Sequence, residues 1–171
     1  MTPLKPFIIA EVAQAHDGNL NIAHAFIDAV AKTGVDAIKF QTHYADEETS
    51  QAEPWRKKFS YIKESRFEYW KRMEFTLKEW KSLAVHSADI GLTFMSSPFS
   101  LKANVILSNC GMQYWKIASG ELTNYPLIDD ICNRGGKVIL SCGLAEEKEI
   151  TKTVSRIKRK GGIVKSILQC T

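Results

Sequence analysis

The chain has 171 residues, of which 44% are hydrophobic and 25% charged, the composition of a globular protein with one ordinary core. Its net charge of +4 is mild, and the basic run at 156–160 is typical of a solvated helix face rather than a nucleic-acid surface. No stretch could span a bilayer, and the N-terminus lacks a signal peptide's apolar core. The four cysteines lack zinc-type spacing, so we expect reduced thiols in a cytoplasmic protein without nucleic-acid or membrane partners.

Apolar segments typical of strands alternate with segments of helical spacing along the whole chain. The expected strands are 7–12, 36–41, 92–97, 114–118, 137–141 and 163–170. The expected helices are 19–33, 76–88, 101–110, 126–134 and 146–160. Strands that alternate with helices of this length form parallel βαβ units.

Two local signals stand out between these elements. Thr76 and Glu79 have the spacing of a capping box at the start of a helix. The long polar and aromatic stretch at 43–75 precedes that helix, and a connection of this length is usually functional or carries its own short helix.

Polar side chains end nearly every expected strand: Glu11, Gln41, Ser97, Ser119 and Ser141. Several strands that contribute to one polar mouth are typical of a β/α barrel more than of an open sheet. A closed barrel of this type needs eight strands, and the sequence predicts six. We therefore expect either an open six-stranded α/β sheet or part of a barrel, with two unpaired strand edges.

Two lysines, Lys39 and Lys116, lie near the ends of separate strands. A cation at the end of a buried strand needs a partner, because an unpaired buried charge is very costly. Both lysines could hold a phosphate or carboxylate as point charges. Alternatively, each could pair internally with Glu11, Glu121 or Asp36, and the two interpretations are compatible. The pattern indicates a pocket for an anionic substrate.

Other polar residues near the strand ends have two interpretations each. Glu11 and Glu121 could act as general acid or base, could hydrogen-bond a sugar, or could balance the lysines. His16 follows the first strand on a loop, where it could contact a ligand or serve as a structural hydrogen-bonding residue. Cys142 and Cys170 end strands, and we expect them to pack. The turns that begin at Ser96, Ser119 and Ser141 suit phosphate oxygens.

Taken together, these motifs resemble the sialic acid synthase family. The opening signature is Phe-Ile-Ile-Ala-Glu-Val-Ala-Gln-Ala-His-Asp-Gly at 7–18, and Lys-Phe-Gln follows at 39–41. Further matches are Ser-Ser-Pro-Phe at 96–99, Trp-Lys-Ile-Ala-Ser-Gly-Glu at 115–121, Ile-Leu-Ser-Cys-Gly at 139–143 and Ile-Leu-Gln-Cys-Thr at 167–171. The resemblance implies an α/β fold, a (β/α)8 TIM barrel of which this chain holds about six β/α units in one incomplete domain, 1–171.

The resemblance also implies an activity. The family condenses phosphoenolpyruvate with an N-acetylated amino sugar aldehyde of the N-acetylmannosamine type, which gives a nine-carbon 2-keto acid and phosphate. By matching motif positions, the catalytic residues would be Glu11, Lys116 and Glu121. The substrate-binding residues would be Lys39, Gln41, Ser97, Lys116, Ser119, Asn124 and Ser141.

Some family features are missing from this sequence. Ala13 and Ala15 stand where the usual signature has glycine and asparagine, and Cys142 stands where threonine is common. The family's two metal-binding histidines and its C-terminal antifreeze-like domain are absent, so we expect no metal ligand in this chain. For a full-length enzyme, the resemblance implies a divalent metal (Mn²⁺ or Mg²⁺) and a homodimer.

Two alternative functions remain open at this stage. The chain could be a non-catalytic truncated fragment that binds an anionic metabolite or a partner chain. It could also be another phosphoenolpyruvate-dependent 3-deoxy-sugar-acid synthase, although the Ser-Gly-Glu and Ser-Ser-Pro-Phe turns favour the sialic acid family. Acceptors of the mannosamine, pseudaminic and legionaminic types all fit the motifs.

Overall fold

The computed structural model describes residues 5–57, 63–143 and 145–170. Its centre is one parallel sheet of six strands, which neighbour one another in the order of the sequence. The strands are β1 (Ile9–Ala13), β2 (Ala37–Thr42), β3 (Thr93–Pro98), β4 (Tyr114–Ile117), β5 (Lys137–Ser141) and β6 (Ile163–Leu168). This confirms the α/β fold with six β/α units. Within the described residues β1 and β6 do not pair, so the sheet is open.

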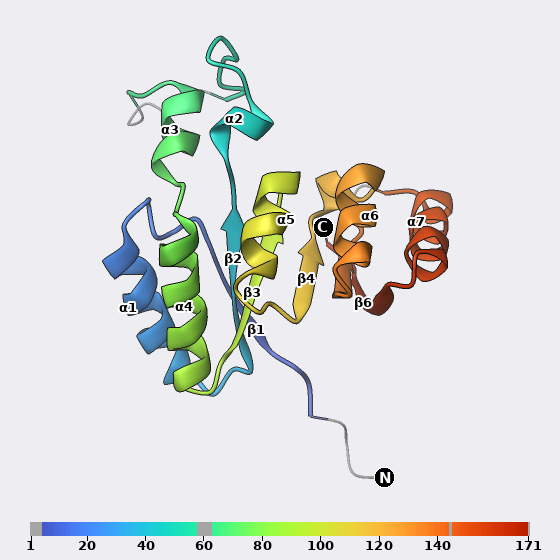
Figure 1. Cartoon of the computed structure of the whole chain (residues 1–171), viewed down its shortest axis with the longest axis horizontal. Coiled ribbons are helices and arrows are strands. Elements are labelled where there is room, and N and C mark those ends of the chain that lie inside the picture. The colour runs from blue at the N-terminus through green and yellow to red at the C-terminus, as the bar shows by residue number, and fades with distance from the viewer. Residues whose placement is uncertain (1–4, 58–62, 144, 171) are drawn as a thin grey trace.

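Helices cover one face of this sheet (Figure 1). They are α1 (Leu20–Ala31), α4 (Leu77–Asp89), α5 (Leu101–Ser108), α6 (Tyr125–Asn133) and α7 (Glu147–Arg159). Two short helices, α2 (Ala45–Glu48) and α3 (Arg66–Arg72), lie beyond the end of β2, and a 3₁₀ helix, η1 (Ser119–Glu121), follows β4. The long segment at 43–75 therefore carries short helices, as the sequence predicts.

Capping explains where two of these helices begin. The Thr76 hydroxyl accepts a hydrogen bond from the Glu79 backbone N–H, and the Glu79 carboxylate accepts from the Thr76 N–H at 2.7 Å. This confirms the predicted capping box. A second capping box, Ser65 with Glu68, starts α3 and was not predicted. Because α3 has only seven residues, this cap supplies a large share of its local stability.

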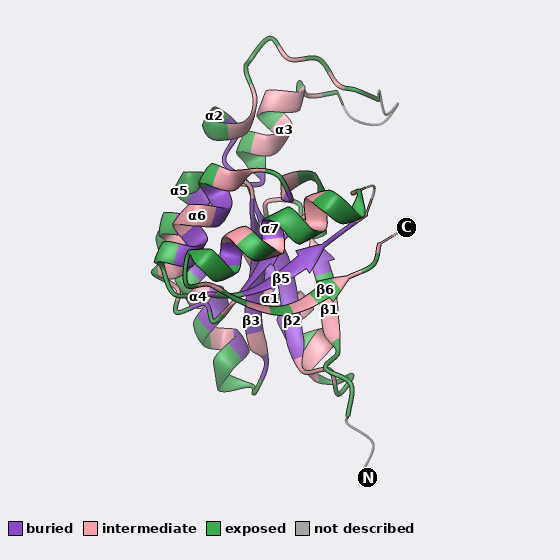
Figure 2. Ribbon diagram, turned by 90° about the vertical axis from the view of Figure 1, so that its right-hand side faces the viewer, coloured by how far each residue is buried: buried purple, intermediate pink, exposed green. Residues whose placement is uncertain are grey.

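The two faces of the sheet differ in chemistry because side chains alternate along each strand. Ile38 and Phe40 of β2 point toward the helices and join the main hydrophobic core. Ala37 points the other way and packs with Met95 and Ile139 in a small second cluster. Figure 2 shows that most of the central sheet is buried. Since Lys39 shares the parity of Ala37, it lies on the inner face with this second cluster.

The edge strands are less covered than the centre. Ile163 and Ile167 of β6 are 57% and 48% exposed, and Phe7 and Ile8 before β1 are 52% and 45% exposed. These apolar side chains flank the two unpaired strand edges that the sequence predicts. Across the described parts of the chain, no helix has the length and apolar character needed to cross a membrane.

The turn after β1 is held tightly against the end of α3. Gly18 has φ +74°, and a Cβ at this position would overlap the carbonyl oxygen of Arg72. Gly34, after α1, has a similar φ of +76° but faces open space. Gly18 is therefore required both for its backbone conformation and for close packing.

We predict that Gly18→Ala lowers the free energy of unfolding by more than Gly34→Ala does. Both variants carry the cost of an L-residue at positive φ, roughly 1–2 kcal/mol. Only Gly18→Ala also forces the β1–α1 turn away from Arg72, which adds an overpacking cost on the order of 1–3 kcal/mol. Urea denaturation of the two variants measures the difference, and equal losses would show that the close approach is not formed.

Candidate functional site

Lys39 and Lys116 lie on the inner face of the sheet, near the ends of β2 and β4. Their exposed fractions are 7% and 8%, so both are nearly removed from water. The Lys39 ammonium forms an ion pair with the Glu11 carboxylate of β1. The Lys116 ammonium donates a hydrogen bond to the carbonyl oxygen of Ile117 at 3.2 Å. Within the described residues, Lys116 has no carboxylate partner, and this part of the site carries excess positive charge.

The environment of Lys116 lowers the pKa of its ammonium to about 8. Burial is the largest cause, and the positive charge of Lys39 is the next. Cys170 and Glu11 oppose the shift only in part. A bound anion would supply the negative charge that Lys116 lacks, so this pair of lysines is suited to an anionic ligand.

Hydroxyl groups lie on the same inner face. Ser97 is 2% exposed and is paired in register with Gln41. The Ser141 hydroxyl oxygen accepts a hydrogen bond from the Cys170 thiol at 3.2 Å. Ser141 can therefore still donate its own proton to a ligand. The expectation that Cys170 only packs is incomplete, whereas Cys142 does pack in the helix-side core.

A cavity of about 870 Å³ lies at the carboxyl ends of β2 and β4. Gln41, Glu121 and Asn124, three of the sequence-predicted site residues, line it together. The Asn124 amide donates to the Glu121 carboxylate at 2.7 Å, and its oxygen caps α6 by accepting from Leu127. Glu121 is thus held in place by the residue that starts the next helix.

Ser119 lies apart from this cavity in the structure. It lines a separate hollow of about 270 Å³, together with Gly143 and Glu149. The sequence predicts that the polar residues at the strand ends line one common opening. In the structure, Ser119 lines a different cavity from Gln41. The division arises because η1 begins at Ser119 and turns the chain away from the end of β4.

His43 is a site residue that the sequence analysis did not predict. Its ring stacks on Phe99 with centroids 4.1 Å apart, and it contacts the carboxylate of Glu48 at 2.6 Å and the amide oxygen of Gln41 at 3.3 Å. His43 is only 6% exposed and lines the 870 Å³ cavity. The available signal was its spacing, because His43 follows Gln41 by two residues at the end of the same strand.

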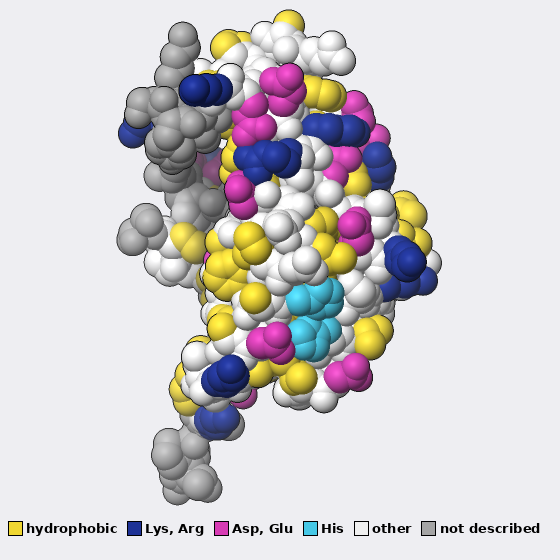
Figure 3. Space-filling model, turned by 90° about the vertical axis from the view of Figure 1, so that its left-hand side faces the viewer, with side chains coloured by type: hydrophobic (Ala, Val, Ile, Leu, Met, Phe, Trp, Pro, Cys, Tyr) yellow, Lys and Arg dark blue, Asp and Glu magenta, His cyan; other side chains and the backbone are white. Residues whose placement is uncertain are grey.

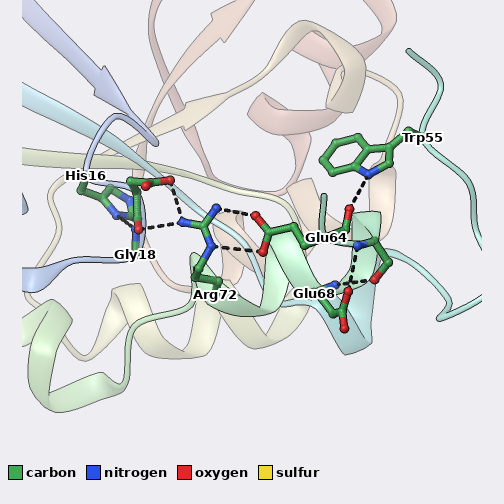
Figure 4. Close-up of polar contacts among 8 residues, drawn as sticks. His16, Gly18, Trp55, Glu64, Glu68 and Arg72 are labelled. Carbon is green, nitrogen blue, oxygen red and sulfur yellow. Dashed lines mark hydrogen bonds and ion pairs between the residues drawn. The ribbon is translucent and has the colours of Figure 1, made fainter. Parts of the chain in front are cut away.

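His16, by contrast, is a structural residue. Its imidazole is fully buried, lies 4.7 Å from the Phe75 ring, and accepts a hydrogen bond from the Gly18 N–H at Nδ1 (Figure 4). Burial lowers the pKa of His16 to about 4, an effect that Asp17 opposes only in part. The neutral ring holds the turn after β1, so the structural interpretation of His16 is the correct one.

A site for a divalent ion needs several histidine, cysteine or carboxylate ligands close together. Within 5–57, 63–143 and 145–170, no three histidine, cysteine, aspartate or glutamate side chains gather where they could hold an ion. His24 and His86 lie side by side on the surface formed by α1 and α4, with ring nitrogens 2.8 Å apart (Figure 3). The two rings form a hydrogen bond between their Nδ1 atoms. The Asp28 carboxylate lies 3.1 Å from the Nε2 atom of His86. The described residues therefore do not fit the divalent ion that the resemblance implies.

The fold is that of a β/α-barrel type of protein whose sheet is open, with two buried lysines and buried hydroxyl groups on its inner face. The chain matches the model of the NeuB family over residues 26–171. The chain belongs to the NeuB family, which confirms the resemblance to sialic acid synthases.

Several relatives support this assignment. The chain is 34% identical to N,N'-diacetyllegionaminic acid synthase of Campylobacter jejuni, over 98% of this chain and 52% of that protein. It is 27% identical to mouse N-acetylneuraminate-9-phosphate synthase, over 96% of this chain and 46% of that protein. The chain thus spans about half the length of the curated relatives it matches.

Solved structures give the same result. N-acetylneuraminic acid synthetase of Leptospira borgpetersenii, in complex with citrate, matches 96% of this chain and 54% of its own length, with a TM-score of 0.79 and 33% identity. A 3-deoxy-D-arabino-heptulosonate 7-phosphate synthase of Thermotoga maritima matches with a TM-score of 0.63 but only 11% identity. That second likeness shows a shared fold alone.

We predict that His16→Phe removes a step from the pH dependence of stability. The native pKa of about 4 lies below the ordinary value of 6.5, so the neutral ring is favoured in the folded state. Its contribution is fully present above pH 6.5, is lost as the pH falls toward 4, and amounts to at most about 3 kcal/mol.

Urea denaturation between pH 4 and pH 7 should give a flatter profile for His16→Phe than for the unmodified protein. His24→Gln is the comparison: burial and the neighbouring His86 lower the pKa of His24 as well, but its ring is only half-buried, so this variant should flatten the profile less. If His16→Phe keeps the full pH dependence, the His16 ring is protonated in the folded protein and the assignment is wrong.

Proposed function

We propose that this chain forms the phosphoenolpyruvate-binding part of an enzyme that condenses phosphoenolpyruvate with an N-acylated amino sugar aldehyde. The product would be a nine-carbon 2-keto acid of the sialic acid type, and phosphate would be released. The observation that carries the proposal is the pair of buried lysines: Lys39 pairs with Glu11, and Lys116 has no carboxylate partner among the described residues. The names of the NeuB relatives support this product class.

Phosphoenolpyruvate carries two anionic groups, a carboxylate and a phosphate, and the inner face of the sheet offers two ammonium groups. Lys39 and Lys116 would each neutralise part of this charge in a site that excludes most water, where electrostatic interactions are strong. Ser97 and Ser141 would donate hydrogen bonds to the same ligand. The complex of the Leptospira relative with citrate, itself a polyanion, is in keeping with an anion site in this family.

The reaction forms one carbon–carbon bond and breaks one carbon–oxygen bond. The methylene carbon of phosphoenolpyruvate attacks the aldehyde carbon, whose oxygen takes a proton and becomes a hydroxyl. Water then adds to the cationic carbon that carries the phosphate and loses a proton, and phosphate leaves as the ketone forms. Glu121 lines the cavity beside Asn124 and would exchange these protons, while Glu11 would keep Lys39 oriented.

The complete protein would contain further parts. We propose that it requires a divalent ion, Mn²⁺ or Mg²⁺, held by residues outside this chain, and that it is a homodimer with a C-terminal antifreeze-like domain. Ser119, which lies in a separate hollow, would join the phosphate site only if η1 moves on binding. No step above depends on the metal.

We predict that Lys116→Gln weakens phosphoenolpyruvate binding at pH 7 by roughly 10- to 100-fold, because a charge-assisted hydrogen bond contributes about 1.5–3 kcal/mol. In the unmodified protein, affinity should also fall as the pH rises through about 8, where Lys116 loses its proton. This step should be absent in Lys116→Gln. Isothermal titration calorimetry of the protein at its full natural length measures both effects.

The matched control is Lys137→Gln. Lys137 is an exposed lysine at the start of β5, where its ammonium lies over the Tyr114 ring. The Lys137→Gln variant should leave the dissociation constant for phosphoenolpyruvate unchanged. If Lys116→Gln behaves like Lys137→Gln, Lys116 is not in the phosphoenolpyruvate site.

A further inference from the structure

The 870 Å³ cavity has two chemically different sides. Gln41, Glu121 and Asn124 form a polar side at the strand ends. Three rings, Trp55, Trp70 and Phe99, form an aromatic wall that lines the same cavity. Trp55 and Trp70 come from the long segment between β2 and α4, which the catalytic proposal does not use. A cavity with both kinds of side suits a ligand with polar groups and one apolar group.

Among the described residues, a hydrogen bond and a ring contact help to fix the position of Trp55. Its indole N–H donates a hydrogen bond to the backbone carbonyl of Glu64 at 3.1 Å. Its ring lies edge-to-face against Tyr69, with centroids 5.3 Å apart and planes at 68°. Since the indole is half-buried and oriented, it offers a preorganised apolar surface to the cavity.

Glu64 in turn is anchored to the turn after β1 (Figure 4). Its carboxylate accepts two hydrogen bonds from the Arg72 guanidinium, at 2.6 and 3.2 Å. The same guanidinium donates to the carboxylate and the carbonyl of Asp17, at 2.6 and 2.9 Å. A continuous series of hydrogen bonds therefore connects the turn after β1 with Trp55 through Arg72 and Glu64.

We propose that the aromatic wall binds the acyl methyl group of the amino sugar acceptor, with Trp55 as the principal contact and Arg72 as a positioning residue. This inference rests on the proposed function, because it assigns the acceptor side of the same site. An N-acetyl group has a polar amide and an apolar methyl group. The amide and hydroxyl groups of the sugar match Gln41, Glu121 and Asn124, and the methyl group matches the rings.

The test compares N-acetyl and N-formyl forms of the acceptor, which differ by one methyl group. The probes are N-acetylmannosamine and N-formylmannosamine, and the 2,4-diacylamino-2,4,6-trideoxy sugars of the same configuration. For whichever pair the full-length protein condenses, we expect it to prefer the acetyl form by roughly 10-fold in kcat/KM. In Trp55→Ala this preference should fall to about two-fold or less, because the apolar contact is gone.

Two further variants separate contact from positioning. Trp55→Phe keeps an apolar ring but loses the bond to Glu64, so its preference should be intermediate. Arg72→Gln should raise the KM for the acceptor several-fold while the dissociation constant for phosphoenolpyruvate stays unchanged. Lys71→Gln is the matched control on the same helix, because Lys71 pairs with Asp46 and Glu74, away from this series of hydrogen bonds.

Acceptor binding is also followed by tryptophan fluorescence, which does not require turnover. Because the chain has four tryptophans, the Trp55 signal is taken as the difference between the unmodified protein and Trp55→Phe. The inference is overturned if Trp55→Ala keeps the full acetyl preference, or if Arg72→Gln weakens both substrates equally. These outcomes leave the proposed function intact, provided that the unmodified enzyme condenses its acceptor. Absence of condensation with every probe would instead overturn the proposed function itself.

Discussion

The site depends on the burial of two neighbouring ammonium groups, those of Lys39 and Lys116, of which Lys39 alone pairs with a carboxylate among the described residues. Water normally screens such a pair, but both lysines are more than nine-tenths buried, so the repulsion is little screened. Glu11 pairs with Lys39, whereas burial and, next, the charge of Lys39 lower the pKa of Lys116 to about 8. A bound anion would stabilise the charged form of Lys116 by supplying a negative charge.

The sheet imposes this arrangement through its register. In parallel pairing, Glu11 lies opposite Lys39, so the ion pair follows from the backbone hydrogen bonds of β1 and β2. The aromatic segment between β2 and α4 then covers the polar strand ends. Its position is fixed by Arg72, which bonds to the turn after β1, and by Gly18, which lets that turn approach. The ion pair of Lys39 and the position of the aromatic segment thus both depend on β1 and the turn that follows it.

Much of this could be predicted from the sequence, because periodicity and capping are local signals. The six strands and the Thr76 capping box were predicted, and the structure confirms both. The functional role of Lys39 and Lys116 stays a prediction. The ion pair of Lys39 with Glu11 was one of several pairings left open, since register is a property of the sheet. The place of Ser119 in a separate hollow and the role of His43 depend on how loops fold back, which no local pattern encodes.

Ala13 stands where the family signature has glycine, and it adopts φ +52° at a register irregularity of β1. Glycine reaches this conformation at lower cost, which accounts for the signature residue, whereas nothing in the structure explains the alanine of this chain.

The most direct test of this account is the pKa of Lys116, measured by NMR on the lysine side-chain carbons with and without phosphoenolpyruvate. The account predicts a pKa near 8 in the free protein that rises toward the ordinary lysine value when the ligand binds, because the anion then supplies the missing negative charge. A pKa that does not change on binding would contradict the central claim that Lys116 holds the substrate.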